Sequence, residues 1–281
     1  MKELIMESYG KINLALDVLY KRDDGYHEIN SVMQQIDLKD ILIFSDHESG
    51  IIIESDDKEM PLNNSNLIYK AWERLKNITG IHKGIRVRVD KKIPIAAGLA
   101  GGSSNGATTL KALNILWDLD LSLEELMAIG KPLGADIPFC IMGGTAKAQG
   151  IGEKLSKLKP FKGKYILLAN PGFGITSGYA YSKLRFNDER LDIDGLITYM
   201  EEDNLELVAK QMRNIMEKPM VEEYPIIQEI KDIMLNHGAL GALMSGSGAT
   251  VFGLFDDEER LLFTEKKLKQ NFDKVYSCLT I

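Results

Sequence analysis

The alternation of apolar and polar positions predicts strands and helices along the whole chain. Residues 85–89 read Ile-Arg-Val-Arg-Val, a strict alternation that is typical of a half-buried strand. Residues 66–79 carry apolar side chains at helical spacing, which predicts an amphipathic helix. The turn signal Asp23-Asp-Gly separates apolar runs at 6–18 and 27–36. These runs therefore predict a β-hairpin or a related connection.

The same pattern predicts a chain of the α+β class with two domains. Further strands are predicted at 41–44, 51–54, 141–146 (with a bend), 165–169, 251–255 and 274–279, and further helices at 103–117, 122–130, 204–216, 225–236 and 258–270. A lysine-rich stretch with Pro160 and Gly163 interrupts this order. We therefore expect an N-terminal domain over 1–158 and a C-terminal domain over 159–281.

Composition narrows the class of protein without identifying a site. The chain has 281 residues, 44% of them hydrophobic, and a net charge of −7, which argues against a duplex nucleic-acid partner. Cys140 and Cys278 lie in no metal-binding pattern, so we interpret them as buried thiols. The N-terminus is too polar for a signal peptide and no apolar run reaches membrane-spanning length. We expect a cytoplasmic protein with no membrane partner.

A glycine-rich segment, residues 94–104, lies between a predicted strand and a predicted helix, and we call it the first glycine loop. Glycines at 98, 101 and 102 let backbone N–H groups approach an anion, and Ser103 or Ser104 can cap the helix. The pattern favours phosphate binding at this helix start, with a plain strand-to-helix turn as the alternative. Residues 245–248, Ser-Gly-Ser-Gly, form a second glycine loop that could close on the same ligand.

Several motifs resemble those of the GHMP kinases, a superfamily of small-molecule kinases. The first glycine loop resembles the superfamily's ATP loop, Ser245-Gly-Ser-Gly-Ala-Thr its C-terminal motif, and Tyr9-Gly-Lys-Ile-Asn-Leu-Ala-Leu its first motif. Within the superfamily, four segments resemble the kinases that act on 4-diphosphocytidyl-2-C-methyl-D-erythritol: Gly10-Lys-Ile-Asn, Arg22-Asp-Asp-Gly-Tyr-His, Gly98-Leu-Ala-Gly-Gly-Ser-Ser-Asn and Gly134-Ala-Asp-Ile-Pro-Phe. The resemblance extends from Lys11 to Thr250.

This resemblance implies a fold and an activity. The fold is α+β with two domains, the first like domain 2 of ribosomal protein S5 and the second ferredoxin-like. The activity is ATP-dependent phosphorylation of the 2-hydroxyl of 4-diphosphocytidyl-2-C-methyl-D-erythritol, a step of the non-mevalonate isoprenoid pathway. Mg²⁺ is expected on the ATP phosphates, with Ser103 or Ser104 as a hydroxyl donor and no dedicated carboxylate ligands.

The resemblance also implies roles for individual residues. Lys11 and Asp136 are the candidate catalytic residues, with Asp136 as base and Lys11 as its electrostatic partner. From the residues alone, a helix cap is the favoured explanation of Asp136 and a solvated strand lysine that of Lys11, and the resemblance reverses this preference. The candidate ATP-binding residues are Pro94, Ile95, Ala96, Ala97, Gly98, Leu99, Ala100, Gly101, Gly102, Ser103 and Ser104.

The acceptor is expected to bind through its cytidine and its polyol. Tyr26 and His27 follow a tight turn, where a ring can stack on a pyrimidine and an imidazole can hydrogen-bond its edge. The candidate substrate-binding residues are Asn13, Tyr26, His27, Ser177, Tyr181, Gly246, Ser247 and Gly248. Tyr179 competes with Tyr181 for the stacking role, and core packing is the simpler reading for Tyr179.

Two other functions remain open at this point. One is a GHMP kinase of homoserine or mevalonate, for which an aromatic cytidine clamp has no purpose. The other is a nucleotide-binding module without turnover, which the presence of both Lys11 and Asp136 disfavours. The sequence leaves the oligomeric state open between a monomer and a weak dimer.

Overall fold

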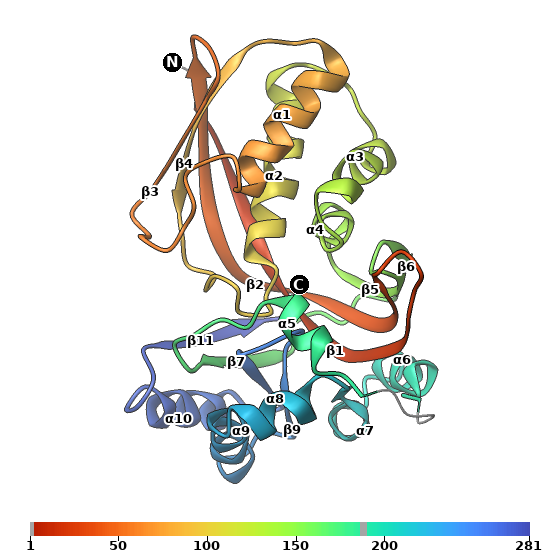
Figure 1. The fold of residues 1–281 in the computed structure, drawn as a ribbon. Coiled ribbons are helices and arrows are strands. Elements are labelled where there is room, and N and C mark those ends of the chain that lie inside the picture. Colours follow the sequence, from red (N-terminus) through yellow and green to blue (C-terminus); the bar gives the residue numbers. More distant parts are fainter. Residues whose placement is uncertain (1–2, 186–189) are drawn as a thin grey trace. The chain divides into compact units, whose positions relative to one another are not determined.

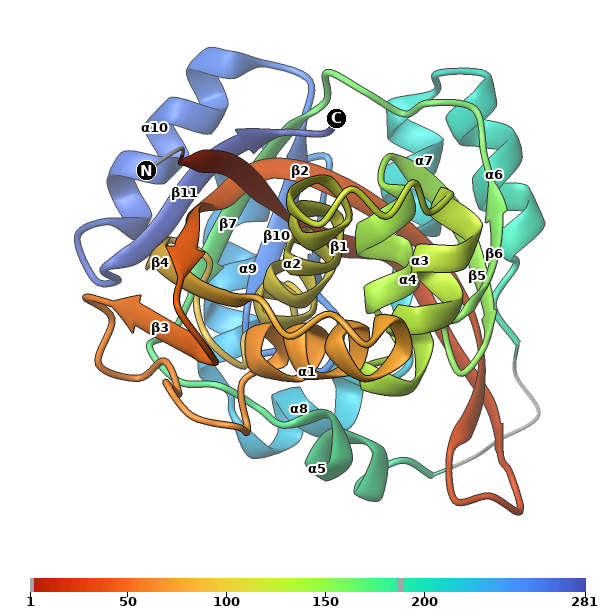
Figure 2. The ribbon, with the colours of Figure 1, turned by 90° about the horizontal axis from the view of Figure 1, so that it is seen from above.

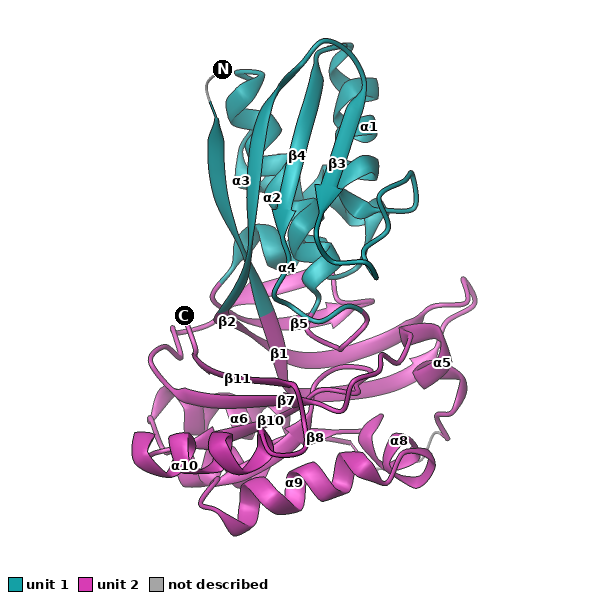
Figure 3. Ribbon diagram, turned by 90° about the vertical axis from the view of Figure 1, so that its left-hand side faces the viewer, with its two compact units in different colours: residues 1–10, 38–95, 100–143 teal, residues 11–37, 96–99, 144–281 magenta. Residues whose placement is uncertain are grey.

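The computed structural model describes residues 3–185 and 190–281. Its contacts group the chain into two compact units (Figure 3). Unit 1 consists of Met1–Gly10, Leu38–Ile95 and Ala100–Gly143, and unit 2 of Lys11–Asp37, Ala96–Leu99 and Gly144–Ile281. These units are not consecutive segments, because two long strands contribute to both. The boundary that we expect after residue 158 stays a prediction.

The two long strands are β1 (Leu4–Lys21) and β2 (His27–His47). Strand β2 is continuous, whereas its sequence predicts two strands at 27–36 and 41–44. It pairs antiparallel with β4 (Gly84–Asp90) in unit 1 and with β5 (Thr145–Gly150) in unit 2, so extended backbone is hydrogen-bonded along most of its length.

Unit 1 packs helices against a sheet. Strand β3 (Ile51–Ser55) pairs parallel with β4. Figures 1 and 2 show helices α1 and α2 side by side. The helices of this unit are α1 (Leu67–Thr79), α2 (Gly101–Leu116), α3 (Leu123–Gly130) and α4 (Ile137–Met142), with a 3₁₀ turn at Lys131–Leu133. Alternating apolar residues of β4 and the apolar faces of α1 and α2 form one core, as periodicity predicts.

The predicted strand at 141–146 is wrong in its first half. Residues 141 and 142 belong to α4, and β5 begins at Thr145. Short apolar runs do not distinguish a buried helix from a strand. Here Pro138 lies in the first turn of α4, where its missing N–H costs nothing, and all of Ile137–Ile141 is buried.

Unit 2 contains a four-stranded sheet in the order β11-β7-β10-β9, antiparallel throughout. Helices α9 and α10 pack on these strands, as Figure 1 shows. The elements are β6 (Lys154–Lys157), β7 (Tyr165–Asn170), α5 (Ser177–Ser182), α6 (Ile193–Glu201), α7 (Leu205–Gln211), β8 (Arg213–Asn214), α8 (Glu217–Glu223), α9 (Ile226–Asn236), β9 (Gly241–Met244), β10 (Val251–Phe255), α10 (Glu258–Leu268) and β11 (Lys274–Leu279).

The predicted helix at 204–216 is also wrong at its end. Helix α7 stops at Gln211, and β8 pairs parallel with β1, Ala15 opposite Arg213 and Leu16 opposite Asn214. The apolar periodicity runs on past the helix, so only the pairing with β1 reveals the break. Among the described residues, no helix is long and apolar enough to cross a bilayer.

Candidate functional site

The first glycine loop has a backbone that suits an anion. Ala96, Gly98 and Ala100 have φ values of 51°, 78° and 56°, whereas Ala97 and Leu99 between them do not have positive φ. Residues that alternate in this way turn successive N–H groups to one side and form an anion-binding concavity. A positive φ strains the backbone of an alanine, and residues with such strained backbone conformations are often found at ligand sites.

The helix that follows the loop offers its N-terminus to a ligand. Helix α2 has Ala100 at its N-cap, no side-chain cap hydrogen bond and no acidic residue in its first turn. The capping role predicted for Ser103 or Ser104 is therefore wrong. Both serines lie inside the first turn, and the buried Ser104 hydroxyl accepts a hydrogen bond from Ser8 at 2.9 Å. Uncapped N–H groups and the helix dipole favour negative charge here.

Within unit 2, the first glycine loop contacts the second. The Ser245 hydroxyl donates to the carbonyl oxygen of Gly98 at 3.0 Å. A Cβ atom at Gly98 would lie 2.0 Å from the Ser245 carbonyl oxygen, so only glycine fits at this contact. The two loops that the sequence associates with one ligand thus lie together at residues 98 and 245–248.

The second glycine loop is held by residues that sequence reasoning missed. The Asn214 amide donates to the carbonyl oxygens of Met244 and Gly246, each at 2.8 Å, and the Ser247 hydroxyl donates to Ile175 at 3.1 Å. Asn214 lies in β8, inside the wrongly predicted helix, and no local motif marks it.

Lys11 belongs to a buried polar chain rather than to a solvated surface. Its side chain is 5% exposed, and its Nζ donates to Asn13 Oδ1 at 2.6 Å. The Asn13 amide donates to Ser31 at 2.9 Å, and the Ser31 hydroxyl donates to the carbonyl of Ala15 at 2.6 Å. The Lys11 backbone N–H also donates to Leu99 of the first glycine loop at 3.1 Å. Unit 2 therefore brings Lys11 and Asn13 to the glycine loops.

Asp136 occupies the N-cap position of α4 in unit 1. Its side chain makes no capping hydrogen bond there, so the explanation of Asp136 as a plain helix cap has no support. Ser103 and Gly134 lie close in the same unit, because a Cβ at Gly134 would be 3.7 Å from the Ser103 hydroxyl. The segment before Asp136 therefore passes beside the first turn of α2.

Two of the residues predicted to bind the cytidine, His27 and Tyr181, form an aromatic pair. The rings of His27 and Tyr181 stack with centroids 4.4 Å apart and planes 12° from parallel. Tyr26 is 59% exposed beside them in sequence, and Ser177 is the exposed first residue of α5, the helix that carries Tyr181. Burial lowers the pKa of the His27 imidazole, and the charge of Lys21 acts in the same direction.

Tyr179 has a different surrounding from Tyr181. Its hydroxyl donates to the Glu223 carboxylate of α8, and the Lys183 ammonium lies 4.8 Å from the centre of its ring. Hydrogen bonds to Tyr179 and Glu223 raise the pKa of Lys183 to about 12. Tyr179 thus links α5 to α8, and Tyr181 is the one that pairs with His27.

The chain matches known kinases over most of its length. The family models "GHMP kinases N terminal domain" and "GHMP kinases C terminal" match residues 66–144 and 196–274. A relative from Caldicellulosiruptor bescii named 4-diphosphocytidyl-2-C-methyl-D-erythritol kinase is 44% identical, over 94% of this chain and 93% of its own. A relative of the same name from Clostridium novyi is 41% identical, over 99% of this chain and 100% of its own.

Solved structures of GHMP kinases have the same fold as this chain. A crystal structure of 4-(cytidine 5'-diphospho)-2C-methyl-D-erythritol kinase superposes with a TM-score of 0.84 at 28% identity, covering 99% of each chain. A homoserine kinase from Cytophaga hutchinsonii has a TM-score of 0.75 at 20% identity, covering 99% of this chain and 94% of its own, which shows the shared fold alone. The α+β GHMP kinase fold expected from the motifs is confirmed.

Proposed function

The chain belongs to the GHMP kinase family, among the 4-diphosphocytidyl-2-C-methyl-D-erythritol kinases, and on this premise we propose that it transfers the γ-phosphoryl group of ATP to the 2-hydroxyl of that substrate. The products are the 2-phosphate of the substrate and ADP. The reaction is an intermediate step in the synthesis of isoprenoid precursors. The observation that carries the proposal is the 44% identity over 94% of the chain to a relative named for this reaction.

ATP binds, in this proposal, at the first glycine loop. The alternating φ signs at residues 96–100 and the uncapped start of α2 support a phosphate there. The contact between Gly98 and Ser245 supports a role of the second glycine loop in closing the same pocket. Positioning and charge stabilisation account for most of the catalysis of phosphoryl transfer, so a rigid donor cradle is the main requirement.

Asp136 and Lys11 are proposed to act on the reacting atoms. The Asp136 carboxylate takes the proton from the 2-hydroxyl as its oxygen forms a bond to the γ-phosphorus, and the bond to the ADP oxygen breaks. The Lys11 ammonium, held by Asn13 at 2.6 Å, stabilises the negative charge on the transferred group. Asn13 is then placed to contact the polyol or a phosphate of the acceptor.

The cytidine is proposed to bind at Tyr26, His27 and Tyr181, with Ser177 at the start of α5. Exposed aromatic area on Tyr26 and the flat pair of His27 and Tyr181 suit a pyrimidine ring. Homoserine and mevalonate have no ring to fill such a place. This difference favours the cytidine substrate over the other superfamily substrates.

Mg²⁺ is proposed to accompany ATP, where it would neutralise charge on the phosphates. Ser103 is the better hydroxyl ligand, because the Ser104 hydroxyl is buried against Ser8. No group of three or more His, Cys, Asp or Glu side chains in residues 3–185 and 190–281 could hold a metal, so ATP itself would supply most of the oxygen ligands. A cytoplasmic location and a domain boundary after residue 158 belong to the same proposal.

An ADP-release assay tests the function. The purified protein with ATP and Mg²⁺ is given 4-diphosphocytidyl-2-C-methyl-D-erythritol, homoserine or mevalonate in parallel, and the product is identified by phosphorus NMR. We expect turnover with the first alone and a new phosphate monoester on its 2-hydroxyl. Turnover with homoserine or mevalonate alone overturns the substrate, and ATP binding without turnover on any of them indicates a non-catalytic module.

A further inference from the structure

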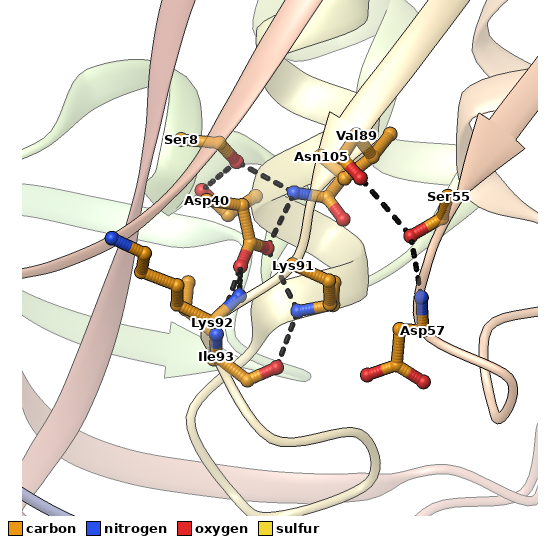
Figure 4. Close-up of polar contacts among 10 residues, drawn as sticks. Ser8, Asp40, Ser55, Asp57, Val89, Lys91, Lys92, Ile93 and Asn105 are labelled. Carbon is orange, nitrogen blue, oxygen red and sulfur yellow. Dashed lines mark hydrogen bonds and ion pairs between the residues drawn. The ribbon is translucent and has the colours of Figure 1, made fainter.

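Asp40 of β2 is a buried carboxylate outside the residues discussed so far, and Figure 4 shows its contacts. Its Oδ1 accepts from the backbone N–H groups of Lys92 and Ile93, each at 2.8 Å. Its Oδ2 accepts from the Lys91 ammonium at 2.7 Å and from the Asn105 amide at 2.8 Å. Asp40 is 0% exposed and the Lys91 side chain only 3%, so this ion pair is removed from water.

The four partners of Asp40 flank the first glycine loop. Lys91, Lys92 and Ile93 come directly before residue 94, and Asn105 comes directly after residue 104. One carboxylate therefore holds both ends of an eleven-residue segment, and does so entirely within unit 1.

The network continues into the first turn of α2. The Asn105 amide also donates to the Ser8 hydroxyl at 2.9 Å (Figure 4). That hydroxyl in turn donates to the Ser104 hydroxyl at 2.9 Å. A Cβ at Gly101 would lie 2.9 Å from Ile93 Cγ2. The end of the loop is thus packed directly on its beginning.

A buried ion pair of this kind is weak evidence for stability, because its desolvation cost rivals its Coulomb gain. What the geometry of Asp40 does provide is a fixed separation of the loop's ends. A loop with two left-handed alanines keeps that conformation only where its surroundings hold it. Preorganised N–H groups bind a phosphate without the cost of ordering them first.

We propose that Asp40 is a positioning residue for ATP, which clamps the two ends of the first glycine loop through Lys92, Ile93 and Asn105. Asp40 itself touches no phosphate. The inference rests on the proposed function in one respect, namely that the loop binds ATP.

The test compares ATP affinity and loop dynamics in matched variants. Asp40→Asn keeps the shape of the side chain but turns an N–H₂ group or a neutral oxygen toward the Lys91 ammonium. We expect the Kd of Mg-ATP, measured by calorimetry, to rise between about tenfold and a hundredfold, with the KM of the acceptor unchanged. Leu75→Ala is the control, because Leu75 is a fully buried apolar residue of α1 in the core of unit 1 and takes no part in the hydrogen bonds of Asp40.

The second variant is Asn105→Leu, which releases the other end of the loop and carries the test alone if Asp40→Asn does not fold. Because Asp40 and Asn105 form the same clamp, the variant with both substitutions should weaken ATP binding no more than Asp40→Asn or Asn105→Leu alone. Fully additive losses, or an equal loss of ATP affinity in an equally destabilised Leu75→Ala, overturn the proposal.

Hydrogen exchange of the ligand-free protein separates this inference from the proposed function. Asp40→Asn should speed exchange of the amides in residues 92–106 and leave α1 unchanged. If the wild-type protein bound no ATP, the proposed function would fail, and the exchange result would still decide whether Asp40 holds the loop. Unchanged exchange in 92–106 would overturn the clamp whatever the ligand.

Discussion

His27 and Tyr181 lie face to face, with their ring centroids 4.4 Å apart and their planes inclined by 12°. A flat base needs about 3.5 Å of contact distance on each of its faces, so no base fits between the two rings as they stand. A cytosine bound here, as proposed, would therefore either separate the pair or stack on the outer face of one of the two rings. Tyr181 would provide contact area if the cytosine separated the pair or stacked on the outer face of Tyr181, whereas the Tyr179 hydroxyl is bonded to Glu223.

The first prediction separates these two tyrosines. Tyr181→Leu should raise the KM for the cytidine substrate by about tenfold, because base stacking is worth roughly 1–3 kcal/mol per base, with the KM for ATP unchanged. Tyr179→Phe is the control, since it keeps the ring and loses the hydroxyl that is hydrogen-bonded to Glu223 and Lys183, and it should change KM for the cytidine substrate less than Tyr181→Leu does. Steady-state kinetics with both substrates varied decides this. An unchanged KM for the cytidine substrate in Tyr181→Leu would exclude Tyr181 as the stacking ring.

The second prediction concerns two glycines of the first loop. Gly98→Ala places a Cβ 2.0 Å from the Ser245 carbonyl oxygen at a φ of +78°, so it should lower the free energy of unfolding and weaken ATP binding together. Gly102→Ala has no atom closer than 3.9 Å to its Cβ and lies in α2, so stability should rise by about 0.5–1 kcal/mol while the KM for ATP also rises. Urea unfolding and kinetics of both variants measure the contrast. An unchanged KM for ATP in Gly102→Ala would show that the phosphate does not bind at the first turn of α2.

The third prediction concerns the proposed base. Asp136→Asn should lower kcat by about two to four decades, because the amide cannot take the proton of the 2-hydroxyl as the carboxylate does. Asp257→Asn is a matched control at the N-cap of α10, where the side chain accepts from Arg260 at 2.8 Å, and kcat should be unaffected. Single-turnover phosphoryl transfer measures the step directly. A wild-type rate in Asp136→Asn would exclude Asp136 as the base.

The fourth prediction is a pH dependence of stability. The pKa of His27 is lowered in the folded protein by burial, below the value of about 6.5 of a free imidazole. As pH falls through 6.5, the unfolded chain takes up a proton first, so the free energy of unfolding decreases until the folded pKa is passed. Above about pH 7.5 the His27 imidazole is neutral in both the folded and the unfolded state, so its protonation no longer changes the free energy of unfolding.

Urea unfolding between pH 8 and pH 5 tests this sign. His27→Gln should lose less stability on acidification than the wild type, because it lacks the group that the folded state keeps neutral. The exposed His82→Gln serves as the control for removal of a histidine. A steeper loss of stability in His27→Gln would contradict the lowered pKa.

Much of the fold follows from local patterns. The strict alternation at 85–89 became β4, and helical spacing at 66–79 became α1, because one apolar face of each packs into the core of unit 1. The local patterns predict the wrong element where contacts with other parts of the chain override a local preference. Residues 213–214 are a strand only because β1 lies beside them, and residues 141–142 are helical because α4 packs on α2 and α3.

Motifs along the chain are enough to indicate the family and, through that resemblance, the residues expected to do the chemistry. The glycine loops stand out on physical grounds as well, because a loop that approaches a phosphate closely needs glycine. The sequence also placed Lys11, His27 and Tyr181 among the candidates. The pairing of Tyr181, and not Tyr179, with His27 is visible only in the folded structure, as are the hydrogen bonds of Asp40 to Asn105, of Ser31 to Asn13 and of Asn214 to the second glycine loop. No sequence motif marked Asp40, Ser31 or Asn214, and the partners of such polar residues become known only when folding removes them from water and supplies their hydrogen bonds.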